Sequence, residues 1–190
     1  MTDGRPIALL GMRCSGKTTV GRMLARRLAR PFVDLDDEVL RFGGYAGAGE
    51  ETVGDLLDRI GLGRFRDLEA GVVKKLLEPS PRIVLATGGG VVERTDSRAW
   101  LRRAARCVWL SVPVDVLQER LARDPAYRPA LLGPDPVSEV PDLLRRRAGH
   151  YRALAEIVIE ADDSPPDVLA EQIFDQLSQD HESTLKSAGD

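Results

Sequence analysis

The sequence has few cysteines, no long apolar run and no excess of basic charge. Its two cysteines, Cys14 and Cys107, stand far apart and outside any CxxC or Cys/His cluster, which argues against a disulfide framework and a zinc site. No apolar run approaches the roughly 18 residues of a membrane-spanning helix, and no basic segment followed by an apolar one opens the chain. We therefore expect a protein of the cytoplasm, a reducing compartment, with no membrane partner.

The charge balance gives no reason to expect nucleic acid as a partner. The formal net charge is -3 and the isoelectric point is near 5.5, so no general positive field surrounds the protein. Hydrophobic residues make up 43% and charged residues 30% of the 190 residues, which is typical of a globular chain with one core. We expect a monomer with one domain over residues 1–179 and a polar, frayed tail over 180–190.

Short apolar runs alternate with segments of helical periodicity along the chain. After the first apolar run, for example, Val20, Leu24 and Leu28 recur at helical spacing. This alternation predicts an α/β fold, in which helices flank a parallel sheet. The predicted strands are 7–10, 32–33, 83–86, 107–112 and 157–159.

Two segments depart from this alternation. Residues 42–51 carry four glycines and no apolar period, which predicts a mobile connection. Helical spacing then returns over 53–60 and 65–76, with a break near Gly61-Leu62-Gly63. The stretch from Arg123 to Pro141 holds five prolines and one glycine, so we predict a lid of about residues 123–141 instead of a regular element.

The segment from Gly11 to Thr18 fits the phosphate-binding pattern GxxxxGK[ST], with a predicted strand before it and a predicted helix after it. Its glycines let the backbone bend so that successive N–H groups and the helix N-terminus converge on phosphate oxygens. Lys17 is expected to reach the β- and γ-phosphates of ATP, and the Thr18 hydroxyl to ligate Mg²⁺. Cys14 stands where many such loops carry glycine. The predicted nucleotide-binding residues here are Gly11, Arg13, Cys14, Ser15, Gly16, Lys17, Thr18 and Thr19.

Two carboxylates, Asp34 and Asp36, follow the second predicted strand. Ligands of open α/β sheets collect at this edge, where one carboxylate can serve a metal shell and another a substrate hydroxyl. The alternative is an acidic helix start favoured by the helix dipole, which applies above all to Asp37 and Glu38.

Arginine and glycine residues further along also fit an anionic acceptor. Arg66 follows the apolar Phe65, and its planar guanidinium suits a carboxylate; the alternative is a surface pair with Glu69. Gly88-Gly89-Gly90 follow the third predicted strand and allow close approach of a ligand. Because that strand lacks the aspartate of a Walker B strand, Mg²⁺ has to rely on Thr18, phosphates and water.

The predicted lid contains Arg128. Closure of the lid can bring this positive charge onto the transferring phosphoryl group, whereas the alternative is an ordinary solvated arginine. Arg120, in the preceding helical segment, is a weaker candidate for flanking the adenine.

Together with the phosphate loop, these motifs resemble shikimate kinases over residues 7–177. The motifs are Asp34-Leu35-Asp36, Phe65-Arg66-Asp67-Leu68-Glu69, Thr87-Gly88-Gly89-Gly90, Arg128-Pro129, and Arg147 with Tyr151. The resemblance implies a P-loop fold whose five parallel strands have the order 2-3-1-4-5 of nucleoside monophosphate kinases. It also implies ATP-dependent phosphorylation of the 3-hydroxyl of shikimate, a step of aromatic amino-acid biosynthesis.

The same resemblance assigns roles to single residues. Lys17, Asp36 and Arg128 are implied to be catalytic, and Asp36 also holds the acceptor hydroxyls. Thr18 and Asp34 are implied to serve the metal, Asp34 through water. The implied shikimate-binding residues are Asp36, Arg66, Gly88, Gly89, Gly90 and Arg147.

The chain departs from the family pattern in its acceptor-binding region, about residues 37–66. This connection is longer than usual, and Gly61-Leu62-Gly63-Arg64 replaces the Gly-Glu that precedes Phe-Arg. A related gluconate or nucleotide kinase, and a non-catalytic ligand-binding regulator on the same fold, are therefore the alternatives. The pair Arg66 and Arg147 favours a carboxylate acceptor, and the retained Lys17, Thr18 and Arg128 favour catalysis.

Overall fold

A computed structural model describes residues 4–43, 52–79, 81–124, 129–133, 135–162 and 164–187. Its centre is a parallel five-stranded sheet with the order β2-β3-β1-β4-β5, which confirms the predicted order. All five predicted strands are present, with ends shifted by at most one residue. Their bounds are β1 Ile7–Leu10, β2 Phe32–Asp34, β3 Val84–Ala86, β4 Arg106–Ser111 and β5 Ile157–Glu160.

The central strands form because helices cover both faces of the sheet. All four residues of β1 are fully buried, and a strand buried on both faces reads as a continuous apolar run. In register, Leu9 pairs with Ala86 of β3 and with Val108 of β4, while Asp34 of β2 also pairs with Ala86. The carboxyl ends of β1, β2 and β3 therefore lie at one edge, where the phosphate loop and Asp34 meet.

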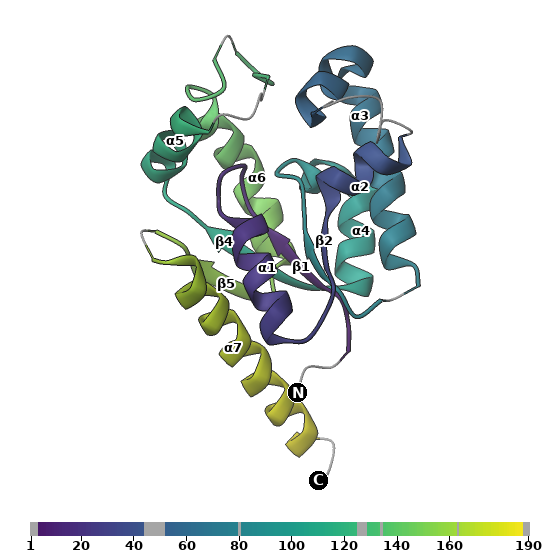
Figure 1. Ribbon diagram of the computed structural model, residues 1–190, viewed down its shortest axis with the longest axis vertical. Coiled ribbons are helices and arrows are strands. Elements are labelled where there is room, and N and C mark those ends of the chain that lie inside the picture. Colours follow the sequence, from purple (N-terminus) through teal and green to yellow (C-terminus); the bar gives the residue numbers. More distant parts are fainter. Residues whose placement is uncertain are drawn as a thin grey trace.

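Helices α1 (Lys17–Arg27) and α7 (Pro166–Ser187) pack against each other on one face of the sheet, and α4 (Thr95–Ala104) and α6 (Val140–Leu154) lie on the other (Figure 1). Helix α5 (Val114–Arg123) packs beside α6. This arrangement leaves the carboxyl edge of the sheet open to the loops that carry the predicted site.

Helices α2 (Leu35–Phe42) and α3 (Val53–Leu77) pack together beyond β2. The predicted break in α3 is confirmed: Gly61 has φ 78° and ψ 156°, a conformation that glycine adopts far more readily than other residues. At the start of α3, the Thr52 hydroxyl caps Asp55 N at 3.2 Å, and the Asp55 carboxylate accepts from Thr52 N at 2.9 Å. This capping box fixes where the helix begins.

Two predicted boundaries differ from the structure. Helix α7 continues past residue 179 to Ser187, because no glycine or proline lies between Pro166 and Gly189 and polar residues can form a helix. Pro141 lies in the first turn of α6, where a helix needs no N–H donor, so the last part of the predicted lid is helical.

Residues 44–51, 125–128 and 134 lie outside the described residues. No helix within the described ranges is long and apolar enough to span a bilayer.

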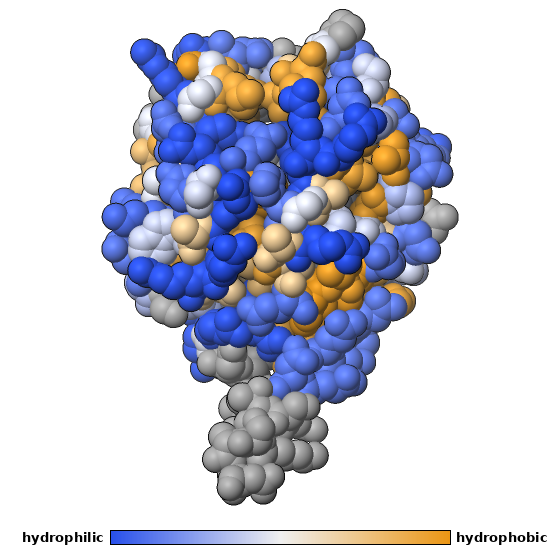
Figure 2. All heavy atoms as spheres, turned by 180° about the vertical axis from the view of Figure 1, so that it is seen from behind, coloured by the Kyte–Doolittle hydropathy of each residue, from blue (hydrophilic) through white to orange (hydrophobic). Residues whose placement is uncertain are grey.

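The face seen in Figure 2 is mainly hydrophilic, with apolar side chains in scattered patches between charged ones. Three large apolar side chains that are exposed lie on separate segments: Leu62 in α3, Leu132 in the lid and Val168 in α7. Most large apolar side chains of the described residues thus lie in the core around the sheet.

Candidate active site

The phosphate loop has the backbone that its glycines predict. Gly11 has φ 146°, and a Cβ there would lie 2.8 Å from both Leu110 O and Ser15 Oγ, while Gly16 has φ 90°. Lys17, the first residue of α1, is 8% exposed, and its Nζ donates to Met12 O at 2.6 Å and to Ser15 Oγ at 3.2 Å. The loop therefore wraps around its own lysine at the positive end of a helix, as anion binding requires.

The structure explains why glycine is common at the position of Cys14. Cys14 has φ 61°, in the left-handed region that glycine occupies most easily. Its Sγ donates to Asp124 Oδ2 at 3.4 Å, and neither cysteine is in a disulfide. Burial raises the pKa of Cys107 to about 12, so that thiol stays protonated.

Two oxygens suited to Mg²⁺ face each other beside the loop. The Thr18 hydroxyl donates to Asp34 Oδ2 at 2.8 Å, and Asp34 Oδ1 caps α2 by accepting from Asp36 N at 3.1 Å. The described residues contain no group of three or more His, Cys, Asp or Glu that could hold a metal. The donor set thus fits an ion that keeps most of its shell as phosphate and water, which is the habit of Mg²⁺.

Two adjoining cavities of about 300 Å³ each lie at the carboxyl edge of the sheet. The phosphate cavity is lined by Arg13, Cys14, Gly16, Lys17, Thr18, Thr19, Asp34, Asp36, Thr87, Gly88, Gly89 and Asp124. The acceptor cavity is lined by Arg13, Asp36, Asp37, Leu40, Thr52, Val53, Gly54, Leu57, Phe65, Arg66, Glu69, Gly88, Gly89, Gly90, Pro129, Leu131 and Arg147. Asp36 lines both cavities, so a group held in one lies next to a group held in the other.

The first turn of α2 divides its carboxylates between the cavities and the surface. Asp36 and Asp37 line the acceptor cavity, and partial burial together with the nearby Asp34 charge raises the pKa of Asp37. Glu38 instead accepts from Arg41 Nε at 3.0 Å on the outside of the helix. The acidic helix start is thus present, since Asp36, Asp37 and Glu38 all lie in the first turn of α2, and Asp36 and Asp37 line the acceptor cavity as well.

Arg66 forms the predicted i,i+3 pair with Glu69, but the pair is buried in the cavity wall and does not lie on the surface. Arg66 Nη1 and Glu69 Oε2 are 2.9 Å apart, with the two side chains 11% and 1% exposed. Burial raises the pKa of Glu69 to about 7, although the Arg66 charge opposes this shift. Within the described part of the chain, Glu69 Oε1 has no hydrogen-bond partner.

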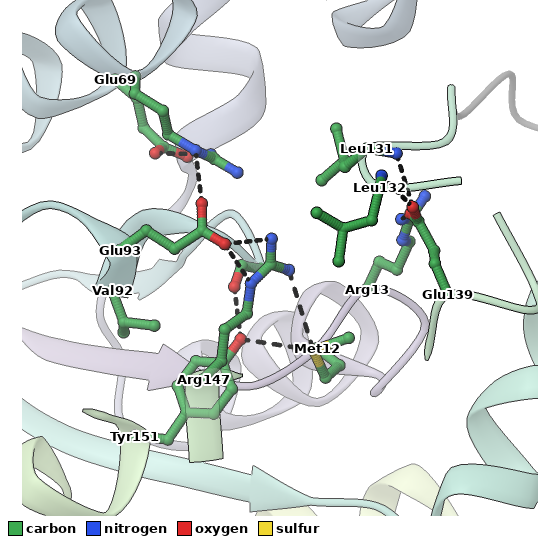
Figure 3. A network of polar contacts seen from close by, with 12 residues as sticks. Met12, Arg13, Glu69, Val92, Glu93, Leu131, Leu132, Glu139, Arg147 and Tyr151 are labelled. Atoms are coloured by element: carbon green, nitrogen blue, oxygen red, sulfur yellow. Dashed lines mark hydrogen bonds and ion pairs between the residues drawn. The ribbon is translucent and has the colours of Figure 1, made fainter. Parts of the chain in front are cut away.

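Arg147 reaches the same cavity from α6, and a further carboxylate joins the two arginines. Arg147 is 2% exposed, and its Nε donates to Glu93 Oε1 at 2.8 Å. Glu93 Oε2 is 3.3 Å from Arg66 Nε. Figure 3 shows Glu93 between Glu69 and Arg147. We did not predict Glu93, whose one sequence signal is its position three residues after the glycine turn.

Each glycine of the turn Gly88–Gly90 makes room for a neighbouring group. A Cβ would lie 2.6 Å from Glu69 Oε1 at Gly88 and 1.7 Å from Arg66 Nη2 at Gly90. The turn is held by Tyr151, a fully buried residue whose hydroxyl donates to Gly89 O. The arginine and the glutamate can therefore approach the turn only because side chains are missing there.

A second group of contacts connects the phosphate loop with the described part of the lid (Figure 3). Arg13 forms an ion pair with Glu139, whose carboxylate also accepts from the backbone N–H groups of Leu131 and Leu132, at 2.7 Å each. Glu139 is 4% exposed. Sequence reasoning missed this residue because it lies in an irregular segment without a motif.

The sequence also predicts Arg120 and Arg128 in the nucleotide site. Arg128 lies outside the described residues. Arg120 donates from Nη2 to Asp162 O at 2.6 Å and does not belong to the described lining of either cavity. The roles of both arginines stay predictions.

Comparison with known proteins agrees with this geometry. A family model described as shikimate kinase matches residues 13–178. The chain belongs to the shikimate kinase family. A shikimate kinase of Bradyrhizobium diazoefficiens is 40% identical over 91% of this chain and 79% of its own. One of Nitratidesulfovibrio vulgaris is 40% identical over 88% of this chain and 92% of its own.

Solved structures of shikimate kinases have the same fold. The enzyme of Acinetobacter baumannii in complex with shikimate superposes with a TM-score of 0.83 at 34% identity, over 93% of this chain and 94% of that one. A gluconokinase of Sinorhizobium meliloti superposes with a TM-score of 0.63 at 16% identity, over 98% and 99% of the two chains. The gluconokinase likeness concerns the fold alone, whereas the shikimate kinase likeness extends to the family.

Proposed function

We propose that this shikimate kinase family member transfers the γ-phosphoryl group of ATP to the 3-hydroxyl of shikimate, giving shikimate 3-phosphate and ADP. The observation that carries this proposal is the shared wall of the two cavities. Asp36 lines both, between the phosphate loop on one side and Arg66 with Arg147 on the other. The complex of the Acinetobacter baumannii relative with shikimate supports the choice of acceptor.

The acceptor cavity has the groups that a small hydroxy acid needs. Shikimate carries one carboxylate and three hydroxyls on a six-membered ring. Two arginine guanidinium groups suit the carboxylate, since each can donate two N–H groups. Asp36 can accept from a hydroxyl, and Leu57 and Phe65 offer apolar surface to the ring. The carboxylate and the reacting hydroxyl would then be held at opposite ends of the acceptor.

The phosphate cavity supplies positive charge for the nucleotide. Lys17 would exchange its bonds within the loop for bonds to the β- and γ-phosphates, and Thr18 and Asp34 would hold Mg²⁺, Asp34 through water. When bound, the ion neutralises charge on the phosphates. Arg128 is proposed to add charge when the lid of about residues 123–141 closes, and Arg120 to flank the adenine.

The transfer itself needs little covalent chemistry from the protein. The 3-hydroxyl oxygen forms a bond to the γ-phosphorus, the bond from that phosphorus to the β,γ-bridging oxygen breaks, and ADP leaves. Asp36 is proposed to accept the hydroxyl proton. Alignment of the two substrates across the shared wall accounts for most of the rate.

A coupled assay of ADP release separates the proposed function from its alternatives. With ATP and Mg²⁺, we expect turnover with shikimate and much weaker turnover with gluconate or nucleoside monophosphates. Turnover with gluconate but not with shikimate would make the protein a gluconate kinase. No turnover with any acceptor, together with measurable shikimate binding, would favour the non-catalytic regulator.

We also propose that the protein works as a monomer in the cytoplasm. Both cysteines are free, which suits a reducing compartment. Light scattering after size-exclusion chromatography checks the first point, and cell fractionation the second.

A further inference from the structure

We propose that Glu93 is a positioning residue that sets the two arginines for the carboxylate of the acceptor, and that it thereby determines specificity for an acid. This inference rests on the proposed function. The juxtaposition that carries it is one carboxylate that forms ion pairs with both guanidinium groups. Glu93 Oε1 accepts from Arg147 Nε at 2.8 Å and lies 2.7 Å from Arg147 Nη2, and Glu93 Oε2 lies 3.3 Å from Arg66 Nε.

Glu93 acts from outside the acceptor cavity. Arg66 and Arg147 line that cavity, but Glu93 does not belong to its described lining. The Glu93 side chain is 34% exposed. A carboxylate behind the two guanidinium groups can hold them without occupying the place of the substrate.

The contacts with Glu93 leave further N–H groups on both arginines. Arg66 Nη1 donates to Glu69, its Nε lies 3.3 Å from Glu93 Oε2 without a hydrogen-bond partner among the described residues, and its Nη2 lies against Gly90. Arg147 Nε donates to Glu93, whereas its Nη2, 2.7 Å from the same oxygen, has no hydrogen-bond partner among the described residues. Its Nη1 lies 3.9 Å from the sulfur of Met12, a weak acceptor. Both arginines line the acceptor cavity and thus keep N–H groups for a carboxylate.

The backbone holds Glu93 firmly in this place. Glu93 ends the short helix η1 (Val91–Glu93), whose Val91 and Val92 are fully buried. Its own N–H donates to Gly90 O at 3.0 Å, and its carbonyl accepts from Arg98 Nη1 at 3.0 Å. Gly90 and Glu93 belong to the same turn. This turn therefore provides both the space that the Arg66 guanidinium occupies and the carboxylate that orients Arg66.

Glu93 also supplies negative charge beside the two arginines. Two neighbouring guanidinium groups repel each other, and a buried donor without an acceptor is costly. Without Glu93, Arg147 would lose the acceptor of its Nε and the counter-charge beside its Nη2, and Arg66 would keep Glu69 alone. The arginines would then adopt other rotamers, and the acceptor hydroxyl would no longer be aligned with the γ-phosphate.

The test compares two acceptors in wild type and in Glu93→Gln, which keeps the shape and removes the charge. The acceptors are shikimate and its analogue with a hydroxymethyl group in place of the carboxylate. We expect kcat/KM for shikimate to fall about tenfold or more, since charged hydrogen bonds are lost. We expect kcat/KM for the analogue and the KM for ATP to change less than about twofold, because neither involves the arginine pair.

Several outcomes would overturn the inference. A lower KM for shikimate in Glu93→Gln would mean that Glu93 competes with the substrate carboxylate. An equal loss with both acceptors would mean a merely structural role, and no loss would mean no role. Asp142→Asn, which removes an exposed carboxylate from α6 next to Arg145, is the matched control and should leave both activities unchanged.

The same assay keeps the two proposals apart. A wild type inactive with shikimate refutes the proposed function, whereas an active wild type with an indifferent Glu93→Gln variant refutes only the role of Glu93. If Glu93→Gln unfolds, Glu93→Asp provides the measurement: it keeps the charge on a shorter side chain, and we expect it to retain more of the preference for shikimate over the analogue than Glu93→Ala does.

Discussion

The two adjoining cavities are built in different ways. Half of the described lining of the phosphate cavity comes from one continuous segment, whose backbone is bent at Gly11 and Gly16 and which leads directly into α1. The acceptor cavity is formed by side chains from α2, α3, the glycine turn, the lid and α6. A backbone cradle recognises phosphate, a group common to all nucleotides, whereas a set of distant side chains can change its substrate by changing single residues. Variants on the two sides should therefore fail in different ways.

The largest effect is expected from Lys17→Ala on the phosphate side. The change removes the charge that stabilises the transferring phosphoryl group, so kcat should fall about a thousandfold with any acceptor. Initial rates at saturating shikimate measure it. Shikimate binding, followed by calorimetry, should change little, and Lys74→Ala on the exposed surface of α3 is the control. A kcat near that of wild type would refute the role of the phosphate loop.

Arg66→Ala, on the acceptor side, should impair the binding of shikimate and leave the binding of ATP nearly unchanged. Loss of a charged donor should raise the KM for shikimate about 30-fold or more, with little change in the KM for ATP. The variant also leaves Glu69 buried without its partner, which should destabilise the fold by about 3 kcal/mol, as measured by urea unfolding. Arg64→Ala, at an exposed position of the same helix, serves as the control. Equal effects on both KM values would contradict the carboxylate clamp.

Gly90→Ala perturbs the acceptor side by a single methyl group. Gly90 has an ordinary negative φ of -100°, so alanine causes no backbone strain there. The added carbon would lie 1.7 Å from Arg66 Nη2 and must displace the guanidinium. We expect the KM for shikimate to rise about tenfold, which corresponds to the loss of about one good hydrogen bond. Gly149→Ala in α6, where nothing lies within 4 Å, should leave both KM values unchanged. Wild-type KM values in Gly90→Ala would show that Arg66 does not bind the acceptor in this position.

Glu69 gives the acceptor side a pH dependence. Its pKa is raised from 4.5 to about 7, so the folded protein holds a proton that the unfolded chain releases. The contribution of this proton to the free energy of unfolding is fully present below about pH 4.5. It is lost as the pH rises to about 7, by up to about 3 kcal/mol. Urea unfolding between these pH values should therefore show a smaller loss of stability in Glu69→Gln than in wild type. Parallel curves for the two proteins would show that Glu69 is ionised throughout.

Cys14→Gly should have the smallest effect, because it removes a side chain from a left-handed position without changing the cradle. Activity should stay within about twofold of wild type, and it should resist thiol oxidants. Assays with and without peroxide test this. A large loss of activity in Cys14→Gly would assign the contact with Asp124 a functional role.

The sheet and the phosphate loop could be predicted from the sequence because local patterns determine them. The buried run at Ile7–Leu10 and the glycines of the loop carry their geometry within a few residues. The break at Gly61 was likewise correctly predicted. The end of α7 was missed because polarity alone does not stop a helix.

Glu93 and Glu139 could not be predicted, because their importance depends on contacts between distant segments. Glu93 contacts α3 and α6 through Arg66 and Arg147, and Glu139 joins the lid to Arg13. The sequence also left open whether Arg66 pairs with Glu69 or faces a ligand, and the structure shows the pair in the cavity wall. Such alternatives depend on burial, which a single sequence does not reveal.

The central claim is that Asp36 lies between a phosphate site and an acid site, and a crystal structure with ADP, Mg²⁺ and shikimate tests it most directly. We predict that the shikimate carboxylate contacts Arg66 and Arg147, and that the 3-hydroxyl lies within hydrogen-bond distance of Asp36 and faces the β-phosphate. A carboxylate bound elsewhere, or a 3-hydroxyl turned away from the phosphate loop, would contradict the account.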